Sequence, residues 1–81
     1  MNGLIRIERG LRSPAGYHYR VIGPDNVQVA QFRRRPDEAQ CWFLTDNEGT
    51  ALLEDGEPIL CTDKKDMLPI ALAWFQRHPI P

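Results

Sequence analysis

The sequence predicts an α+β domain with two layers, in which an antiparallel meander sheet of five to six strands carries one C-terminal helix packed on one face. Two observations lead to this prediction. Residues 4–61 contain short stretches of alternating apolar and polar side chains, and clusters of turn-forming residues separate them. Residues 66–78 have the periodicity of a helix and hold the densest apolar side chains. A chain of 81 residues predicts a single domain.

The first part of the chain predicts four strands joined by turns. These strands are expected at residues 4–9, 17–22, 27–33 and 40–45. The connection at residues 10–16 contains a turn cluster at residues 13–16, and residues 23–26 suit a type I turn because proline stands second and Asp-Asn follows it. The third strand changes parity between Val29 and Ala30, which predicts a β-bulge there.

Two acidic turns organise the next part of the chain. Residues 46–49 turn the chain back into a strand at residues 50–53, and residues 54–57 turn it again into a last strand at residues 58–61. The apolar run at residues 40–45 predicts a strand buried on both faces. Elements that follow one another in the sequence can all be neighbours in space, which favours a meander.

The C-terminal helix is predicted to begin with Asp66 as its N-cap, after a single turn over residues 62–66. This start places Pro69 in the first helical turn, where it needs no intrahelical N–H. Pro79 ends the helix, because a residue before proline is disfavoured in the helical region. One stripe of side chains is expected on the sheet: Met67, Ile70, Ala71, Trp74 and His78. A flank of Leu68, Leu72 and Phe75 is either embedded in the same sheet or faces a protein partner or a second copy of the chain.

The charges of the chain divide into two halves. Residues 1–36 carry seven arginines against two acids, a net charge of +5. Residues 37–81 carry three basic residues against nine acids, a net charge of −6. If the fold keeps the two sets apart, one surface is basic and another acidic. The candidate interaction residues are Arg6, Arg20, Arg33, Arg34 and Arg35 on the basic side, and Glu54, Asp55 and Glu57 on the acidic side.

This polarity favours a small non-enzymatic protein-interaction module, of the kind that phages and mobile elements use as accessory or inhibitor proteins. Its acidic turns would dock on a basic surface, and a homodimer would add stability to so short a chain. The alternative is a nucleic-acid-binding domain that uses the arginine-rich first half. Tyr17 and Tyr19 would then stack on bases, although alternation places Arg20 on the opposite face of their strand.

An enzyme or a metal-binding protein is a weaker alternative. His18, Cys41, Cys61 and His78 lack the close spacing of a zinc site. Both cysteines lie in apolar runs, which favours reduced core thiols, with a disulfide between neighbouring strands as the alternative. The glycine signatures of phosphate and dinucleotide loops are absent, so no cofactor is predicted.

The chain is predicted to be a cytoplasmic protein that does not enter a membrane. Its apolar runs are shorter than the ~20 residues that a membrane helix needs. Residues 1–6 lack the apolar core of a signal peptide.

Overall fold

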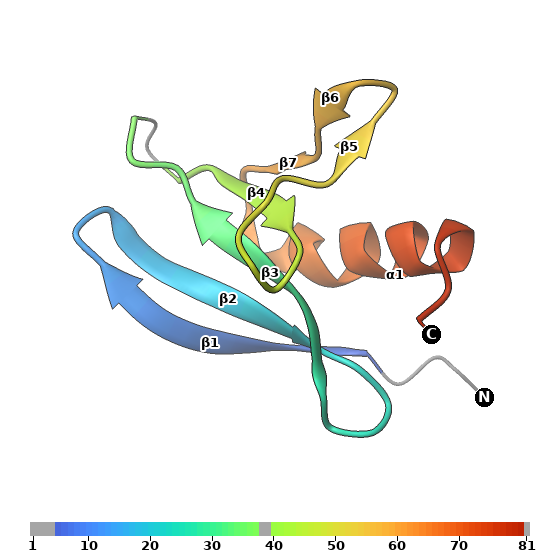
Figure 1. Ribbon diagram of the computed structural model, residues 1–81. Helices are drawn as coiled ribbons and strands as arrows, with labels where there is room; N and C mark the ends of the chain where they lie inside the picture. Colours follow the sequence, from blue (N-terminus) through green and yellow to red (C-terminus); the bar gives the residue numbers. More distant parts are fainter. Residues whose placement is uncertain (1–4, 38–39, 81) are drawn as a thin grey trace.

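A computed structural model describes residues 5–37 and 40–80 of the chain. It confirms the predicted α+β fold, with one antiparallel sheet and a C-terminal helix (Figure 1). The main sheet has five strands in the order β1-β2-β3-β4-β7. Their bounds are β1 (Arg6–Ser13), β2 (Gly16–Ile22), β3 (Gln28–Arg34), β4 (Trp42–Thr45) and β7 (Leu60–Cys61). The remaining elements are a hairpin of β5 (Leu53–Glu54) and β6 (Glu57–Pro58), a 3-10 turn η1 (Lys64–Asp66) and the helix α1 (Met67–Arg77).

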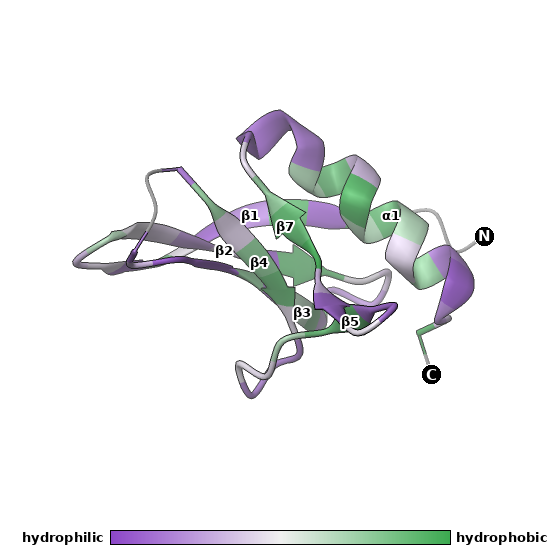
Figure 2. Cartoon of the chain, turned by 90° about the horizontal axis from the view of Figure 1, so that it is seen from above, coloured by the Kyte–Doolittle hydropathy of each residue, from purple (hydrophilic) through white to green (hydrophobic). Residues whose placement is uncertain are grey.

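Helix α1 covers one face of the main sheet, which we call the inner face, and the core lies between the two layers (Figure 2). Phe32 and Leu44 lie opposite each other on β3 and β4, and both are fully buried. The helix contributes Met67, Ala71 and Trp74, as the predicted stripe requires. Each large apolar side chain buried here stabilises the fold by about 1.5–3 kcal/mol. The opposite face of the sheet, the outer face, is not covered by α1.

The first hairpin is longer than the sequence predicts. Strand β1 continues to Ser13, through residues that were expected to form a turn cluster, and Ser13 pairs with Gly16. The register shifts between Arg9 and Arg12, so the extra residues form an irregularity inside β1 and do not end it. Only Pro14 and Ala15 remain as the turn. Leu4, where the first strand was expected to begin, lies outside the described residues.

The predicted bulge in the third strand is confirmed. Val21 pairs with Ala30, and the next pair along the ladder is Ile22 with Gln28. Val29 is therefore the extra residue. The bulge returns Ala30 to the inner face, where it is fully buried.

The second half of the sheet is less regular than a simple meander. In place of a strand at residues 50–53, the chain makes one isolated bridge between Thr45 and Ala51. Residues 53–58 form the separate β5–β6 hairpin, and β7 then pairs directly with β4. Trp42 lies opposite Cys61 in that pairing. The strand at residues 40–45 begins only at Trp42, and Phe43 on its outer side is half-buried.

The start of the helix differs from the prediction in its cap. The single turn before Met67 is present as η1, but the side chain of Asp66 makes no capping hydrogen bond. The carboxylate of Asp63 instead accepts a hydrogen bond from the Lys65 N–H at 3.1 Å. Because η1 continues into α1, the unsatisfied N–H groups lie one turn earlier than expected, and the cap moves with them. Within residues 5–37 and 40–80, no helix has the length and apolar character that spanning a membrane requires.

Candidate functional site

The β1–β2 hairpin becomes a two-stranded ribbon at its outer end. Strand β2 pairs with β3 only as far as Tyr19, which lies opposite Phe32. Beyond Tyr19, the pairing of β2 is with β1 alone, up to the pair of Ser13 and Gly16. We call this ribbon, residues 9–18, the arm. Figures 1 and 2 both show the arm projecting past the end of the region that α1 covers.

Two side chains tie the base of the arm to the rest of the sheet. Nδ1 of His18 accepts a hydrogen bond from the backbone N–H of Arg34 at 2.8 Å. The indole N–H of Trp42 donates to the carbonyl oxygen of Tyr17 at 2.9 Å. These bonds satisfy backbone groups at the place where the β2–β3 ladder opens. The arm is thus held in a defined direction although it leaves the sheet.

The arginines fall into paired and unpaired groups. Glu8 accepts hydrogen bonds from Arg6 at 2.6 Å and from Arg20 at 2.7 Å. Arg35 pairs with Asp37 at 3.1 Å, and Arg77 pairs with Glu54. Within the described part of the chain, the arginines without a carboxylate partner are Arg9, Arg12, Arg33 and Arg34. We call these four the unpaired arginines. They lie on the arm and on the adjoining end of β3.

The inner face of the arm carries arginines stacked on aromatic rings. The guanidinium of Arg9 lies 4.6 Å from the centre of the Tyr17 ring, and that of Arg12 lies 5.8 Å from it. Arg34 lies 4.8 Å from the centre of the Trp42 ring. Such stacking holds a guanidinium in place, and the Nε atom of Arg34 is buried.

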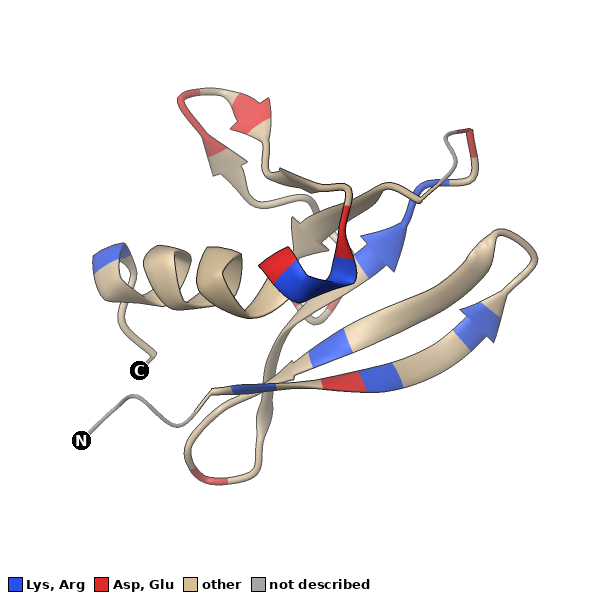
Figure 3. Cartoon of the chain, turned by 180° about the vertical axis from the view of Figure 1, so that it is seen from behind, with Lys and Arg blue, Asp and Glu red and all other residues tan. Residues whose placement is uncertain are grey.

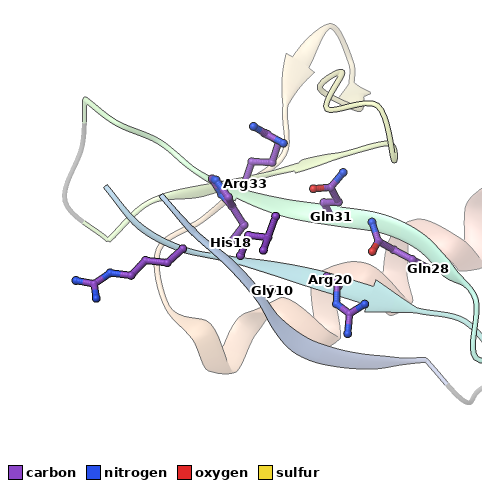
Figure 4. A pocket seen from close by; sticks show the side chains of 8 residues that line it. Gly10, His18, Arg20, Gln28, Gln31 and Arg33 are labelled. Carbon is purple, nitrogen blue, oxygen red and sulfur yellow. The ribbon is translucent and has the colours of Figure 1, made fainter. Parts of the chain in front are cut away.

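The outer face of the arm and of β3 forms a shallow hollow of about 400 Å³. Figure 4 shows the side chains of His18, Arg20, Gln31 and Arg33 on this face, from β2 and β3. Leu11 and Arg12 line the hollow on the β1 side. Three of the eight residues that line the hollow are arginines.

The turn at residues 46–49 borders β3 on the outer face. The Gln31 amide donates to the carbonyl oxygen of Asn47 at 2.9 Å, and the amide groups of Gln28 and Asn47 interact at 3.0 Å. The two glutamines therefore serve to fix this turn. Gly49 of the turn lies against the guanidinium of Arg33, because a Cβ there would be 3.6 Å from Arg33 Nη1.

Two titratable groups respond to the arginines. The hydrogen bond and charge of Arg6, together with Arg20, hold the pKa of the Glu8 carboxyl below its usual value. Partial burial and the charge of Arg33 lower the pKa of His18. Glu8 is therefore ionised and His18 uncharged at neutral pH, and Glu8 is the carboxylate that offsets positive charge on the outer face.

The acidic residues lie apart from the arm. Glu54, Asp55 and Glu57 are all exposed on the β5–β6 hairpin. Figure 3 shows this hairpin on the other side of the molecule from the β1–β2 turn. The predicted acidic residues are thus separate from the arm, but Arg35 lines one hollow together with Pro58 of the β5–β6 hairpin and pairs with Asp37.

The flank of α1 is mostly used within the chain. Leu72 and Phe75 are half-buried and pack against the protein's own core. Leu68 is 38% exposed. Of the three residues predicted to face a partner, Leu68 is the most accessible.

The candidate cysteines and histidines do not come together. Cys41 and Cys61 are buried and are not joined in a disulfide, and burial raises the pKa of the Cys61 thiol. His18 lies on β2, and His78 stacks on Trp74 with ring centres 3.8 Å apart. Among the described residues, no three histidine, cysteine or acidic side chains lie close enough to hold a metal ion.

The sequence pattern does not predict Arg9, Arg12 or Leu11 as site residues. Residues 10–16 resemble a connection between two strands, and this conceals the extension of β1. A clearly alternating stretch ends at Arg9, and a further arginine, Arg12, follows three residues later. This second arginine is the feature of the sequence that indicates a continuing basic strand. The described part of the site combines these residues with the predicted Arg20, Arg33 and Arg34.

Comparison of the chain with protein-family models, with curated proteins and with solved structures gives no match.

Proposed function

We propose that the protein is a non-enzymatic module that binds nucleic acid through the arm and the adjoining end of β3. The observation that carries this proposal is the gathering of the four unpaired arginines at one end of a chain whose net charge is −1. Positive charges so placed repel one another, and a polyanion relieves that repulsion. Guanidinium groups also match phosphate in a forked, bidentate geometry.

The contacts around the arginines support a permanent binding surface. Arg9, Arg12 and Arg34 rest on aromatic rings, so less rotamer entropy is lost when they bind a phosphate. Arg33 is placed by the turn at residues 46–49. A set of arginines that served solubility alone would not need such positioning.

Fluorescence anisotropy with labelled oligonucleotides over a salt series tests the proposal. We expect binding that weakens as salt rises, because phosphate contacts release counterions. The double variant R9Q/R12Q should lower the slope of log K against log salt by about 1.4–1.8, which corresponds to two phosphate contacts.

The matched control is K64Q/K65Q, which removes the same charge from η1, outside the arm. We expect K64Q/K65Q to change the slope by less than about a third as much as R9Q/R12Q does, because phosphate contacts act at close range. Absence of salt-dependent binding to any nucleic acid would overturn the proposal, and so would a control that weakens binding as much as R9Q/R12Q does.

A second candidate function is docking to a basic protein surface through the β5–β6 hairpin. The observation in its favour is that Glu54, Asp55 and Glu57 are exposed together on a hairpin that stands apart from the main sheet. The ion pair between Glu54 and Arg77 offsets part of this negative charge, so we rank this function second. For this function, we expect an immobilised arginine-rich peptide to retain the native protein and not the D55N/E57Q variant.

Location in the cytoplasm belongs to the same proposal. Two buried thiols that are not joined to each other suit a reducing compartment. Nucleic acid is also accessible there.

A further inference from the structure

Unpaired arginines lie on both faces of the sheet where the arm adjoins β3, and this bears on the form of nucleic acid that fits. Arg9 and Arg34 lie on the inner face with Tyr17 and Trp42. Arg33 lines the hollow on the outer face. A single strand laid on a sheet would meet one face only. Two walls of phosphate, one on each side of the ribbon, would meet both.

The size of the arm agrees with a groove of duplex DNA. One layer of sheet with its side chains is about 10 Å thick, whereas the major groove is about 12 Å wide and the minor groove about 6 Å. Along β2, from Tyr19 to Gly16, the ribbon extends about 10 Å at 3.4 Å per residue, and the major groove is about 8.5 Å deep. The arm is thin enough for the major groove and long enough to reach its floor.

The aromatic side chains argue against a single-stranded ligand. Tyr17 is covered by the guanidiniums of Arg9 and Arg12. Tyr19 packs edge-on against Trp42, with ring centres 6.0 Å apart and an angle of 77° between the planes. The rings that would stack on unpaired bases are thus engaged inside the protein. Leu11 is 83% exposed near the end of the arm, where an apolar side chain can contact a thymine methyl group.

From these observations we propose that the arm enters the major groove of duplex DNA tip first, with its two faces toward the two phosphate backbones. This inference rests on the proposed nucleic-acid-binding function and specifies its ligand. Arg9 then contacts one backbone and Arg33 the other. The turn of Pro14 and Ala15 then lies nearest the base edges, and Leu11 and Arg12 stand behind it on β1.

Competition at the grooves tests this inference with the full chain. In a duplex with glucosylated 5-hydroxymethylcytosine, the sugar fills the major groove. We expect this duplex to bind about tenfold more weakly than the unmodified duplex, because the contacts in the groove are blocked. Distamycin, which occupies the minor groove, should change the affinity by less than about twofold. A single strand of the same length should bind about tenfold more weakly than the duplex.

The variants R9Q and R33Q test the contact of both faces. Each should lower the salt slope on duplex DNA by about 0.9, one phosphate each, and thermal unfolding confirms that each variant is folded. The inference is overturned if only one of the two variants lowers the slope, if distamycin displaces the protein, or if single strands bind as tightly as the duplex. Each of these results leaves nucleic-acid binding intact. If the native protein shows no salt-dependent binding to any nucleic acid, the proposed function fails, and the inference fails with it.

Discussion

His18 joins the arm to β3 through an uncharged ring nitrogen, and this makes the fold sensitive to pH. Nδ1 can accept the Arg34 N–H only while it carries no proton, so the hydrogen bond assigns the neutral form. Burial and Arg33 lower the pKa of His18 in the folded state. The unfolded chain, with a histidine pKa of about 6.5, therefore binds more protons below neutral pH.

The free energy of unfolding is expected to fall as the pH drops from 7.5 through 6.5 toward 5.5, because proton uptake favours the unfolded chain in that window. Urea unfolding at the two ends of the range measures it. In H18Q an amide oxygen can accept the same bond without titrating, so its loss of stability over the range should be smaller. Equal losses in H18Q and the native protein would show that other groups cause the effect.

The contact between His18 and Arg34 also shows what residue patterns leave undetermined. Alternation correctly predicts that His18 and Tyr17 point to opposite faces of their strand. It does not predict that the ladder between β2 and β3 opens beyond Tyr19. Because the unpaired backbone groups arise only from that opening, their side-chain partners could not be inferred from spacing alone.

Among the elements, those governed by local chemistry were predicted best. The bulge at Val29 follows from a change of parity, and the turn before Met67 follows from where Pro69 can stand in a helix. The extension of β1 was missed because Gly10 and the residues after it resemble a turn. Its continuation depends on pairing with β2, which is a non-local interaction. The same holds for β7, whose partner is β4 and not the hairpin before it.

The turn of the arm provides a test at this scale. Gly16 has a φ of +138°, and a Cβ there would lie 2.8 Å from Arg34 Nη1. G16A is therefore expected to destabilise the fold by about 1–3 kcal/mol, from backbone strain together with displacement of the arginine from Trp42. In a domain of this size, that lowers the melting temperature by roughly 4–8 °C per kcal/mol.

The matched variant is G56A in the turn of the β5–β6 hairpin. Gly56 has a φ of +80°, but nothing lies within 4 Å of a Cβ at that position. G56A therefore measures backbone strain without a close contact, and we expect a smaller loss of melting temperature than in G16A. A loss in G56A as large as that in G16A would show that neither the larger φ of Gly16 nor its contact with Arg34 adds to the cost.

On the scale of the whole molecule, the acidic β5–β6 hairpin and the basic arm lie apart, whereas the acidic turn at residues 46–49 borders β3 beside Arg33. Figure 3 shows the β5–β6 hairpin and the turn of the β1–β2 hairpin on opposite sides of the view. The sequence could predict this because each hairpin is formed by a contiguous segment, which carries its charges with it. It could not show that Glu8 stands between Arg6 and Arg20, since that contact depends on the register of β1 and β2.

The effect of an acidic residue on the affinity for DNA should therefore depend on its distance from the arm and on the salt concentration. The molecule is 37 Å along its longest axis, whereas charges are screened within about 8 Å at 0.15 M salt. D55N/E57Q, which changes the net charge from −1 to +1, is expected to alter the affinity for duplex DNA by less than about twofold at 0.15 M. At 0.01 M salt the screening length is about 30 Å, and the same variant should bind several times more tightly.

E8Q should strengthen binding at both salt concentrations, because Glu8 competes with phosphate for Arg6 and Arg20 at direct contact. Anisotropy titrations of the two variants measure this difference, and a gain in D55N/E57Q at 0.15 M equal to that in E8Q would place the bound DNA near the acidic hairpin and not on the arm.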